Sequence, residues 1–177
     1  VVLKTHLNLK KIYNDLITII IPRHISRSNE INKLCNNYKL SSQILNDREF
    51  IEEKNEIIII NSFGSLHKFY NYSKSVFIGK SMLKKLHKVG GQNPIEAAKL
   101  GCKIYHGPHV YNFKEIYDLL NSYKISEEIN NVAELSEKLA NDLKELKNNE
   151  NKITNSINDM GNRILSDTTN EIKKYLM

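Results

Sequence analysis

"EIIII", Glu56 to Ile60, places four consecutive isoleucines behind a single glutamate, and this stretch decides the fold class of the chain. Isoleucine is β-branched and favours extended structure. A strand that is apolar on both faces is typical of a parallel sheet with helices packed on each side. The stretch therefore predicts an α/β fold built around a mostly parallel sheet.

Strand-like and helix-like segments alternate on both sides of this stretch. Short apolar runs predict further strands at 15–22, 39–45, 75–78, 103–105 and 123–129, and helical spacing of apolar residues predicts helices at 28–38, 65–72, 94–100 and 113–122. Two longer amphipathic patterns, at 132–147 and 150–176, predict helices near the end of the chain. About six strands alternating with helices indicate an open, doubly wound, Rossmann-like sheet.

Length and composition favour a single soluble domain. The chain has 177 residues, of which 40% are hydrophobic, enough for one sizeable core. No apolar run approaches the roughly 20 residues that span a bilayer. The chain begins Val1-Val2 without an initiator Met or a leader, so we expect a fragment of a longer protein. Cys35 and Cys102 are isolated, which predicts two buried thiols in a reducing compartment.

Charge is spread unevenly along the chain. Residues 1–110 hold 17 Lys and Arg against 8 Asp and Glu, and residues 111–177 hold 9 against 12, so the two parts carry +9 and −3. A positive field suits a nucleotide, a nucleic acid or an anionic membrane surface. Nucleic acid is disfavoured, because the sequence has no compact basic helix and its nine tyrosines are scattered.

The predicted fold indicates where a ligand binds. In open parallel sheets, ligands lie outside the carboxyl ends of the strands, in the loops that lead into helices. Four loops of this kind stand out, at 22–24, 61–65, 79–93 and 106–112.

The third of these loops ends in the segment GGQNPIE, residues 90–96. Gly90 and Gly91 allow close approach of the backbone, Asn93 is a good N-cap, and Pro94 suits the first helical position. The start of that helix favours a phosphate, and Glu96 suits the two hydroxyls of a ribose. The same residues also fit a capping box, in which Glu96 bonds back to the Asn93 amide. The residues alone leave both roles open.

Four motifs together resemble one enzyme family. PRHISR at 22–27, NSFGSLHKFY at 61–70, GGQNPIEAAKLG at 90–101 and GPHVYNFKEI at 107–116 are similar in order and spacing to motifs of bacterial 3-deoxy-D-manno-octulosonic acid (Kdo) transferases. These enzymes belong to lipid A and lipopolysaccharide biosynthesis. The similarity runs from about Leu3 to the C-terminal helices.

The resemblance implies a metal-independent, inverting glycosyltransferase of the two-domain GT-B type, which transfers Kdo from CMP-Kdo to a lipid A precursor (lipid IVA). It further implies that this chain is the C-terminal, donor-binding half, with a Rossmann-like core at 1–130 and helices at 131–177 packed on the same domain. The N-terminal acceptor domain, with the catalytic base, is absent from the chain. We therefore expect no catalytic residue here, no cofactor, and binding of CMP without transfer. The full protein is expected at the cytoplasmic face of the bacterial inner membrane.

The family's nucleotide contacts carry over onto the loops chosen above. They fall on Pro22, Arg23, Phe63, Gly64, Ser65, Asn93, Pro94, Ile95 and Glu96. Arg23 is implied to contact the phosphate, the backbone of 63–65 to hold the base, and Glu96 to bind the ribose. Gln92 stands where the family usually has His, and it cannot titrate near neutral pH.

Other interpretations stay open beside this one. Lys80, Lys84, Lys85 and Lys88 either meet anionic groups of a ligand or form a solvated loop. A zinc site at His24, His87, His106 and His109 is disfavoured, because their spacing fixes no ligand geometry. A GT-B transferase or epimerase that uses a UDP-sugar, and a non-catalytic nucleotide-binding module, remain the alternative functions.

Overall fold

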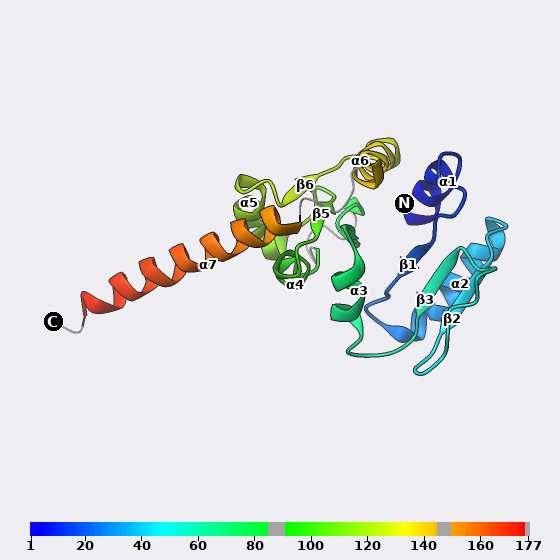
Figure 1. Ribbon diagram of the computed structural model, residues 1–177, viewed down its shortest axis with the longest axis horizontal. Coiled ribbons are helices and arrows are strands. Elements are labelled where there is room, and N and C mark those ends of the chain that lie inside the picture. The colour runs from blue at the N-terminus through cyan, green and yellow to red at the C-terminus, as the bar shows by residue number, and fades with distance from the viewer. Residues whose placement is uncertain (85–90, 145–149, 176–177) are drawn as a thin grey trace. The chain divides into compact units, whose positions relative to one another are not determined.

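The structure, a computed structural model, describes residues 1–84, 91–144 and 150–175, which divide between two compact units (Figure 1). Unit 1 consists of Val1–Phe69 and Asn131–Asn141, and unit 2 of Tyr70–Asn130 and Asp142–Met177. Each unit has its own parallel sheet and its own apolar core, so each is described by itself. The expected division at residue 130 stays a prediction.

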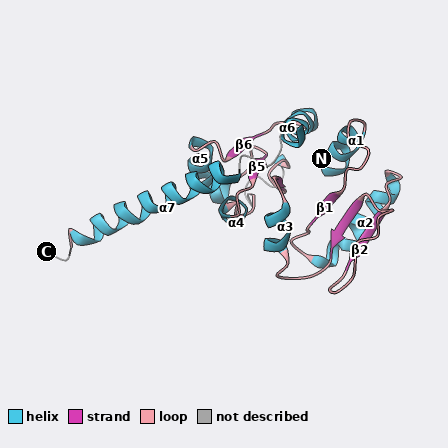
Figure 2. Ribbon diagram, in the orientation of Figure 1, coloured by secondary structure: helices cyan, strands magenta, loops and turns pink. Residues whose placement is uncertain are grey.

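Unit 1 is built around the isoleucine strand. Its elements are α1 (Val2–Lys10), β1 (Thr18–Ile20), the short 3-10 helix η1 (Ile25–Arg27), α2 (Ser28–Asn37), β2 (Ser42–Leu45), β3 (Ile57–Ile60), the start of α3 (Leu66–Tyr72) and most of α6 (Val132–Lys144). Strand β3 lies between β1 and β2 and is parallel to both. Helix α2 packs against β2 and β3 (Figure 2). All four isoleucines of β3 are at most 1% exposed, which confirms that this strand is covered on both faces.

A polar network ties α1 to the amino-terminal edge of this sheet. The buried ring of His6 places Nδ1 2.9 Å from Thr18 Oγ1 and Nε2 3.3 Å from the Glu56 carboxylate. Glu56 also accepts hydrogen bonds from Ser41 and lies 3.4 Å from Lys10 Nζ. Burial opposes ionisation of Glu56 most strongly, but these partners together outweigh it and lower its pKa. The one glutamate of the EIIII stretch is therefore a structural anchor.

Unit 2 has a second parallel sheet in the order β4-β5-β6. Its elements are β4 (Ser75–Ile78), α4 (Ile95–Lys99), β5 (Lys103–His106), the 3-10 helix η3 (Tyr111–Phe113), α5 (Lys114–Ser122), β6 (Ser126–Glu128) and α7 (Glu150–Lys173). Its core includes Ala97, Ile104, Tyr117 and Leu120. Helix α7 joins this core through Ile157, with Met160 packed against it, whereas Ile164 and Leu165 beyond are exposed.

Most predicted elements are present, with ends shifted by a few residues. The α/β class and the parallel pairing are confirmed, and the structure adds that the six described strands pair as two groups of three. Helix α1 was not among the predictions; its first turn has no acidic residue, and no side chain caps it. Cys35 and Cys102 are both buried and free, as predicted.

The apolar stripe predicted along 132–147 is only partly buried. Leu135 is 1% exposed, but Leu143 is 47% exposed, so the prediction that it faces a core is wrong. Leu146 and residue 176 lie outside the described residues. Within the part of the chain that the structure describes, no helix combines the length and apolar character needed to cross a membrane.

Candidate functional site

In unit 1, the loop after β1 presents one guanidinium without a protein partner. Pro22 is half-buried and Arg23 is exposed. Arg27, four residues on, is held by Glu30 at 3.1 Å. Among the described residues, Arg23 forms no hydrogen bond or ion pair. Its side chain is therefore available for a charge-assisted contact to an anion.

The segment after β3 begins with an asparagine that bonds to the end of β2 and to the start of α2. Asn61 Oδ1 accepts a hydrogen bond from Ser28 Oγ at 2.9 Å, and Asn61 Nδ2 donates to Asn46 Oδ1 at 2.8 Å. Asn46 directly follows β2 and Ser28 is the first residue of α2, so one amide group links the ends of β2 and β3 to the start of α2. Asn61 therefore has a structural role in this chain.

The predicted contact residues 63–65 follow directly. Gly64 has φ +75°, a conformation that other residues rarely adopt, and an added Cβ there would meet nothing within 4 Å. The side chain of Phe63 is 77% exposed. Ser65 Oγ lies 3.2 Å from Ser62 Oγ. This turn therefore leaves open space beside the Gly64 backbone.

In unit 2, the start of α4 separates the two roles considered for Asn93 and Glu96. Asn93 Oδ1 accepts a hydrogen bond from the Ile95 amide at 2.9 Å, but the helix begins at Ile95, so Pro94 takes the N-cap position predicted for Asn93. Pro94 is buried and Ile95 is half-buried. Glu96 is exposed, and its carboxylate bonds neither to the Asn93 amide nor to any other described residue, so the capping box is not formed. Gly90 lies outside the described residues.

Helix α5 supports the segment that precedes α4. The Tyr117 hydroxyl donates to the Gln92 carbonyl at 2.9 Å, and Tyr117 is 1% exposed. Gly91 is buried, and a Cβ there would lie 3.2 Å from Val110 Cγ1. Burial raises the pKa of Tyr117 above its ordinary value, so the hydroxyl keeps its proton and remains a donor.

The pKa of Tyr70 is influenced by the negative charge of Glu96. Burial, with a further contribution from the negative charge of Glu96, raises the pKa of Tyr70 to about 12. The Glu96 carboxylate is therefore close enough to act on a neighbouring buried hydroxyl. It remains exposed to solvent on its other side.

Ser81 is a site-shaping residue that the sequence patterns did not reveal. It is 0% exposed, and its Oγ donates to the Ile78 carbonyl and accepts from the Gly107 amide, each at 2.8 Å. Its own carbonyl accepts from the His109 amide at 2.8 Å. These bonds join the loop after β4 to the loop after β5. The sequence feature closest to it was the GPH motif at 107–109, because Gly107 and His109 of this motif are the residues that bond to Ser81.

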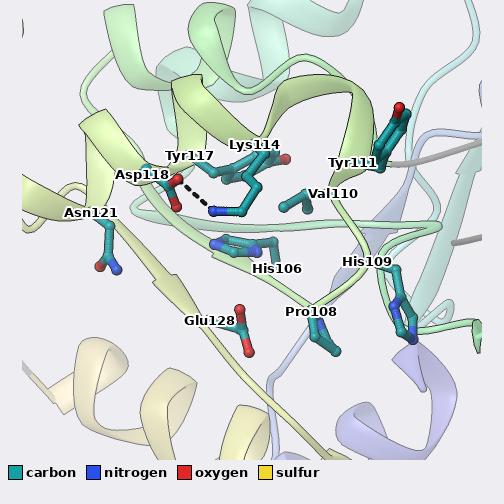
Figure 3. Close-up of a pocket in the computed structure, with 10 residues that line it drawn as sticks. All are labelled: His106, Pro108, His109, Val110, Tyr111, Lys114, Tyr117, Asp118, Asn121 and Glu128. Carbon is teal, nitrogen blue, oxygen red and sulfur yellow. Dashed lines mark hydrogen bonds and ion pairs between the residues drawn. The ribbon is translucent and has the colours of Figure 1, made fainter. Parts of the chain in front are cut away.

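A pocket of about 310 Å³ lies at the carboxyl ends of β5 and β6, beside α5 (Figure 3). It is lined by His106, Pro108, His109, Val110, Tyr111, Lys114, Tyr117, Asp118, Asn121 and Glu128. Of this set, His106 and His109 belonged to the disfavoured zinc site, and no residue of the set was among the predicted nucleotide contacts. Among the described residues, which exclude His87, no group of three or more His, Cys, Asp or Glu residues could hold a metal ion.

The lysine-rich loop is described only in part. Lys80 is half-buried with φ +71°, and Lys84 is exposed, whereas Lys85 and Lys88 lie outside the described residues.

The predicted nucleotide contacts form two groups, each at the carboxyl ends of parallel strands. One group, Pro22, Arg23 and 63–65, lies in unit 1, and the other, Asn93 to Glu96, lies in unit 2.

Parallel strands whose carboxyl ends lead into a capped helix define an α/β chain of the nucleotide-binding class. No protein-family model matches the chain. Individual relatives do: it is 27% identical over 176 residues to a 3-deoxy-D-manno-octulosonic acid transferase of Haemophilus influenzae, covering 99% of this chain and 39% of that protein. It is 30% identical over 162 residues to the transferase of the same name from Rickettsia prowazekii, covering 82% of this chain and 34% of that protein.

A solved structure carries the same fold. The C-terminal CMP-Kdo binding domain of WaaA from Acinetobacter baumannii matches with a TM-score of 0.76 at 21% identity, over 89% of this chain and 79% of that one. The chain is thus a relative of the Kdo transferases, as its motifs predicted, and it has the fold of their C-terminal domain. It spans about two fifths of the length of the curated relatives, at 39% and 37% of the first two.

Proposed function

We propose that this chain is the donor-nucleotide-binding part of a glycosyltransferase that transfers Kdo from CMP-Kdo to a lipid A precursor in lipopolysaccharide biosynthesis. One observation carries the proposal: similarity to Kdo transferases extends over 99% of the chain and includes the GGQNPIE segment. The exposed, unpartnered Glu96 supports it from the structure, because the carboxylate is not consumed by capping.

In this proposal, the segment before α4 binds the ribose and phosphate of CMP. Asn93 holds the helix start through the Ile95 amide, so the remaining amides of the first turn face the phosphate. Glu96 accepts hydrogen bonds from the two ribose hydroxyls, which are donors that a carboxylate pairs well with. Pro94 and Ile95 shape the approach of the backbone.

Within unit 1, the resemblance assigns further contacts to the nucleotide. Arg23 supplies a positive charge for the phosphate, and Pro22 fixes the backbone beside it. The turn at Phe63, Gly64 and Ser65 offers backbone groups to the base, since Gly64 leaves space for close approach.

The remainder of the full protein supplies the rest of the reaction. The acceptor cleft, the catalytic base and the attachment to the cytoplasmic face of the inner membrane are assigned to the N-terminal domain that relatives of greater length contain. Transfer is inverting and independent of metal, and no residue of this chain is assigned a catalytic role.

Calorimetric titration with CMP and with UDP tests the nucleotide assignment. We expect CMP to bind at least roughly tenfold more tightly, a difference of about 1.4 kcal/mol. A preference for UDP favours the alternative of a UDP-sugar transferase or epimerase and contradicts Kdo transfer. The upstream coding sequence tests the other alternative, because a gene without a second Rossmann-like domain encodes a non-catalytic binding module.

A further inference from the structure

The pocket of unit 2 presents two acceptor side chains next to each other. His106 and Glu128 are paired positions of the parallel strands β5 and β6, so their side chains leave the sheet on the same face. Lys114 and Asp118, from α5, lie across the His106 ring from Glu128 (Figure 3). None of these residues belongs to the predicted nucleotide contacts.

The hydrogen bonding of His106 fixes which ring nitrogen is an acceptor. The ring is almost fully buried, and its Nδ1 lies 2.8 Å from the Gly107 carbonyl. A carbonyl only accepts, so Nδ1 carries the proton, and Nε2 of the neutral ring is an acceptor. Burial lowers the pKa of His106 despite the nearby charges of Glu128 and Asp118, which keeps the ring neutral at neutral pH. Nε2 has no hydrogen-bond partner among the described residues.

The charge of the pocket selects against anions. Lys114 Nζ and the Asp118 carboxylate are paired at 2.8 Å, so their charges largely cancel. Glu128 is exposed and has no ion-pair partner in the described part of the chain. Beside the neutral His106 ring, the two carboxylates of Asp118 and Glu128 outnumber the single ammonium of Lys114, and this excess of negative charge disfavours a phosphate or carboxylate ligand.

We propose that this pocket binds an uncharged, hydroxyl-rich ring of the sugar class, at a site separate from the nucleotide contacts. Hydroxyl groups of the ring donate to His106 Nε2 and to Glu128, two acceptors without a donor among the described residues. Pro108 and Val110 supply apolar surface for its C–H groups. The volume of about 310 Å³ lies at the lower end of the range for small-molecule pockets, which suits one ring.

The experiment is saturation-transfer NMR on the 177-residue chain with glucose, glucuronate and glucosamine as probes. These probes share one ring and differ in charge. We expect transfer to glucose, and at least roughly tenfold weaker binding of glucuronate. Glu128→Gln is expected to weaken glucose binding severalfold, because an amide is a poorer acceptor than a carboxylate. The matched control is Glu115→Gln, an exposed position on α5 outside the pocket.

Three results overturn the proposal. They are equal transfer to glucose in the Glu128→Gln and Glu115→Gln chains, tighter binding of glucuronate than of glucose, and binding of glucosamine alone, which would show attraction to charge and not recognition of hydroxyls. Glu128 is exposed, so its amide variant is expected to fold, which circular dichroism checks. A titration of the same samples with CMP measures nucleotide binding independently. Failure of the sugar proposal and failure of the nucleotide proposal can therefore be told apart.

Discussion

At Gly107, the structure leaves no room for a side chain. A Cβ there would lie 2.6 Å from both the Ser81 carbonyl oxygen and Met82 Sδ. Because one of these neighbours is backbone that itself accepts a hydrogen bond from His109, it cannot move aside cheaply. Gly107→Ala is therefore expected to lower the free energy of unfolding by about 1–3 kcal/mol in urea denaturation.

Gly79 provides the matched control for this substitution. A Cβ added at Gly79 would meet nothing within 4 Å. Gly79→Ala is expected to change the free energy of unfolding by less than about 0.5 kcal/mol. Equal losses in the two variants would show that the Ser81 contact does not constrain the loop.

His106 predicts a pH dependence of stability. Burial lowers its folded pKa, against the opposing Gly107 hydrogen bond and the charges of Glu128 and Asp118. The unfolded chain therefore takes up a proton more readily, near its ordinary pKa of about 6.5. Stability from this group is fully present above that pH and is lost as pH falls through it.

Unfolding free energies measured from about pH 8 to about pH 5.5 check this prediction. The wild-type chain is expected to lose stability across that range, and His106→Gln is expected to flatten the curve. A variant with the wild-type slope would mean that the loss arises elsewhere.

At the residue level, local chemistry was predictable and tertiary support was not. The sequence of Asn93 and Pro94 predicted a helix start, and α4 begins one residue later than predicted, with the Ile95 amide bonded to Asn93 Oδ1. The role of Ser81 depends on bonds to residues 3 and 26 positions away, of which the second has no local signal. The pair of His106 and Glu128 likewise depends on strand register.

At the scale of elements, α5 holds the segment that leads into α4. The Tyr117 hydroxyl is the donor to the Gln92 carbonyl at 2.9 Å. Tyr117→Phe keeps the ring, which packs 4.2 Å from the His106 ring centroid, and removes only this bond. We expect a loss of about 0.5–1.5 kcal/mol in stability and a severalfold loss of CMP affinity, since Glu96 follows in the same segment.

Tyr123→Phe is the control for this substitution, because Tyr123 is half-buried and its hydroxyl has no described partner. Calorimetry with CMP compares the two variants. If Tyr117→Phe loses stability but binds CMP as the wild type does, the α5 contact supports the fold alone.

The elements themselves were predicted well where apolar patterns were strong. The stretch Glu56 to Ile60 predicted a fully buried strand, and β3 is one. Helix α1 escaped prediction, because no side chain caps it and its buried face mixes Leu3 and Leu7 with His6, which bonds to Thr18 and Glu56. Leu143 was expected on the buried face of α6 but is exposed. Helical spacing predicts which face of a helix is apolar, but not how much of that face other elements cover.

At the scale of the whole molecule, the chain is expected to bind donor without transferring it. It spans 39% of the length of its Haemophilus influenzae relative, and the proposal assigns the acceptor cleft and the base to residues outside this chain. Incubation with CMP-Kdo and a lipid A precursor, followed by mass spectrometry of the lipid, is expected to show no added Kdo. A clear rate of transfer from this chain would contradict the division of roles.

The fold class was predictable from the sequence, but the grouping of strands was not. Patterns of apolar residues are local features of the sequence, and they predicted six parallel strands with helices between them. Pairing depends on contacts between distant segments, and the structure groups the described strands as β1-β3-β2 and β4-β5-β6. The expected function came from the resemblance of four short motifs to the Kdo transferases. The spacing of apolar residues predicts helices and strands but carries no information about function.

The most direct test of the proposed function compares CMP with 2′-deoxy-CMP on the wild-type and Glu96→Ala chains. The wild type is expected to bind CMP at least roughly tenfold more tightly than the deoxy analogue. Glu96→Ala is expected to lose both CMP affinity and that preference, with the free energy of unfolding unchanged. The contradicting result is a Glu96→Ala chain that keeps the wild-type CMP affinity and preference but loses about 1 kcal/mol of stability. That result would mean that Glu96 stabilises the helix start and does not bind the ribose.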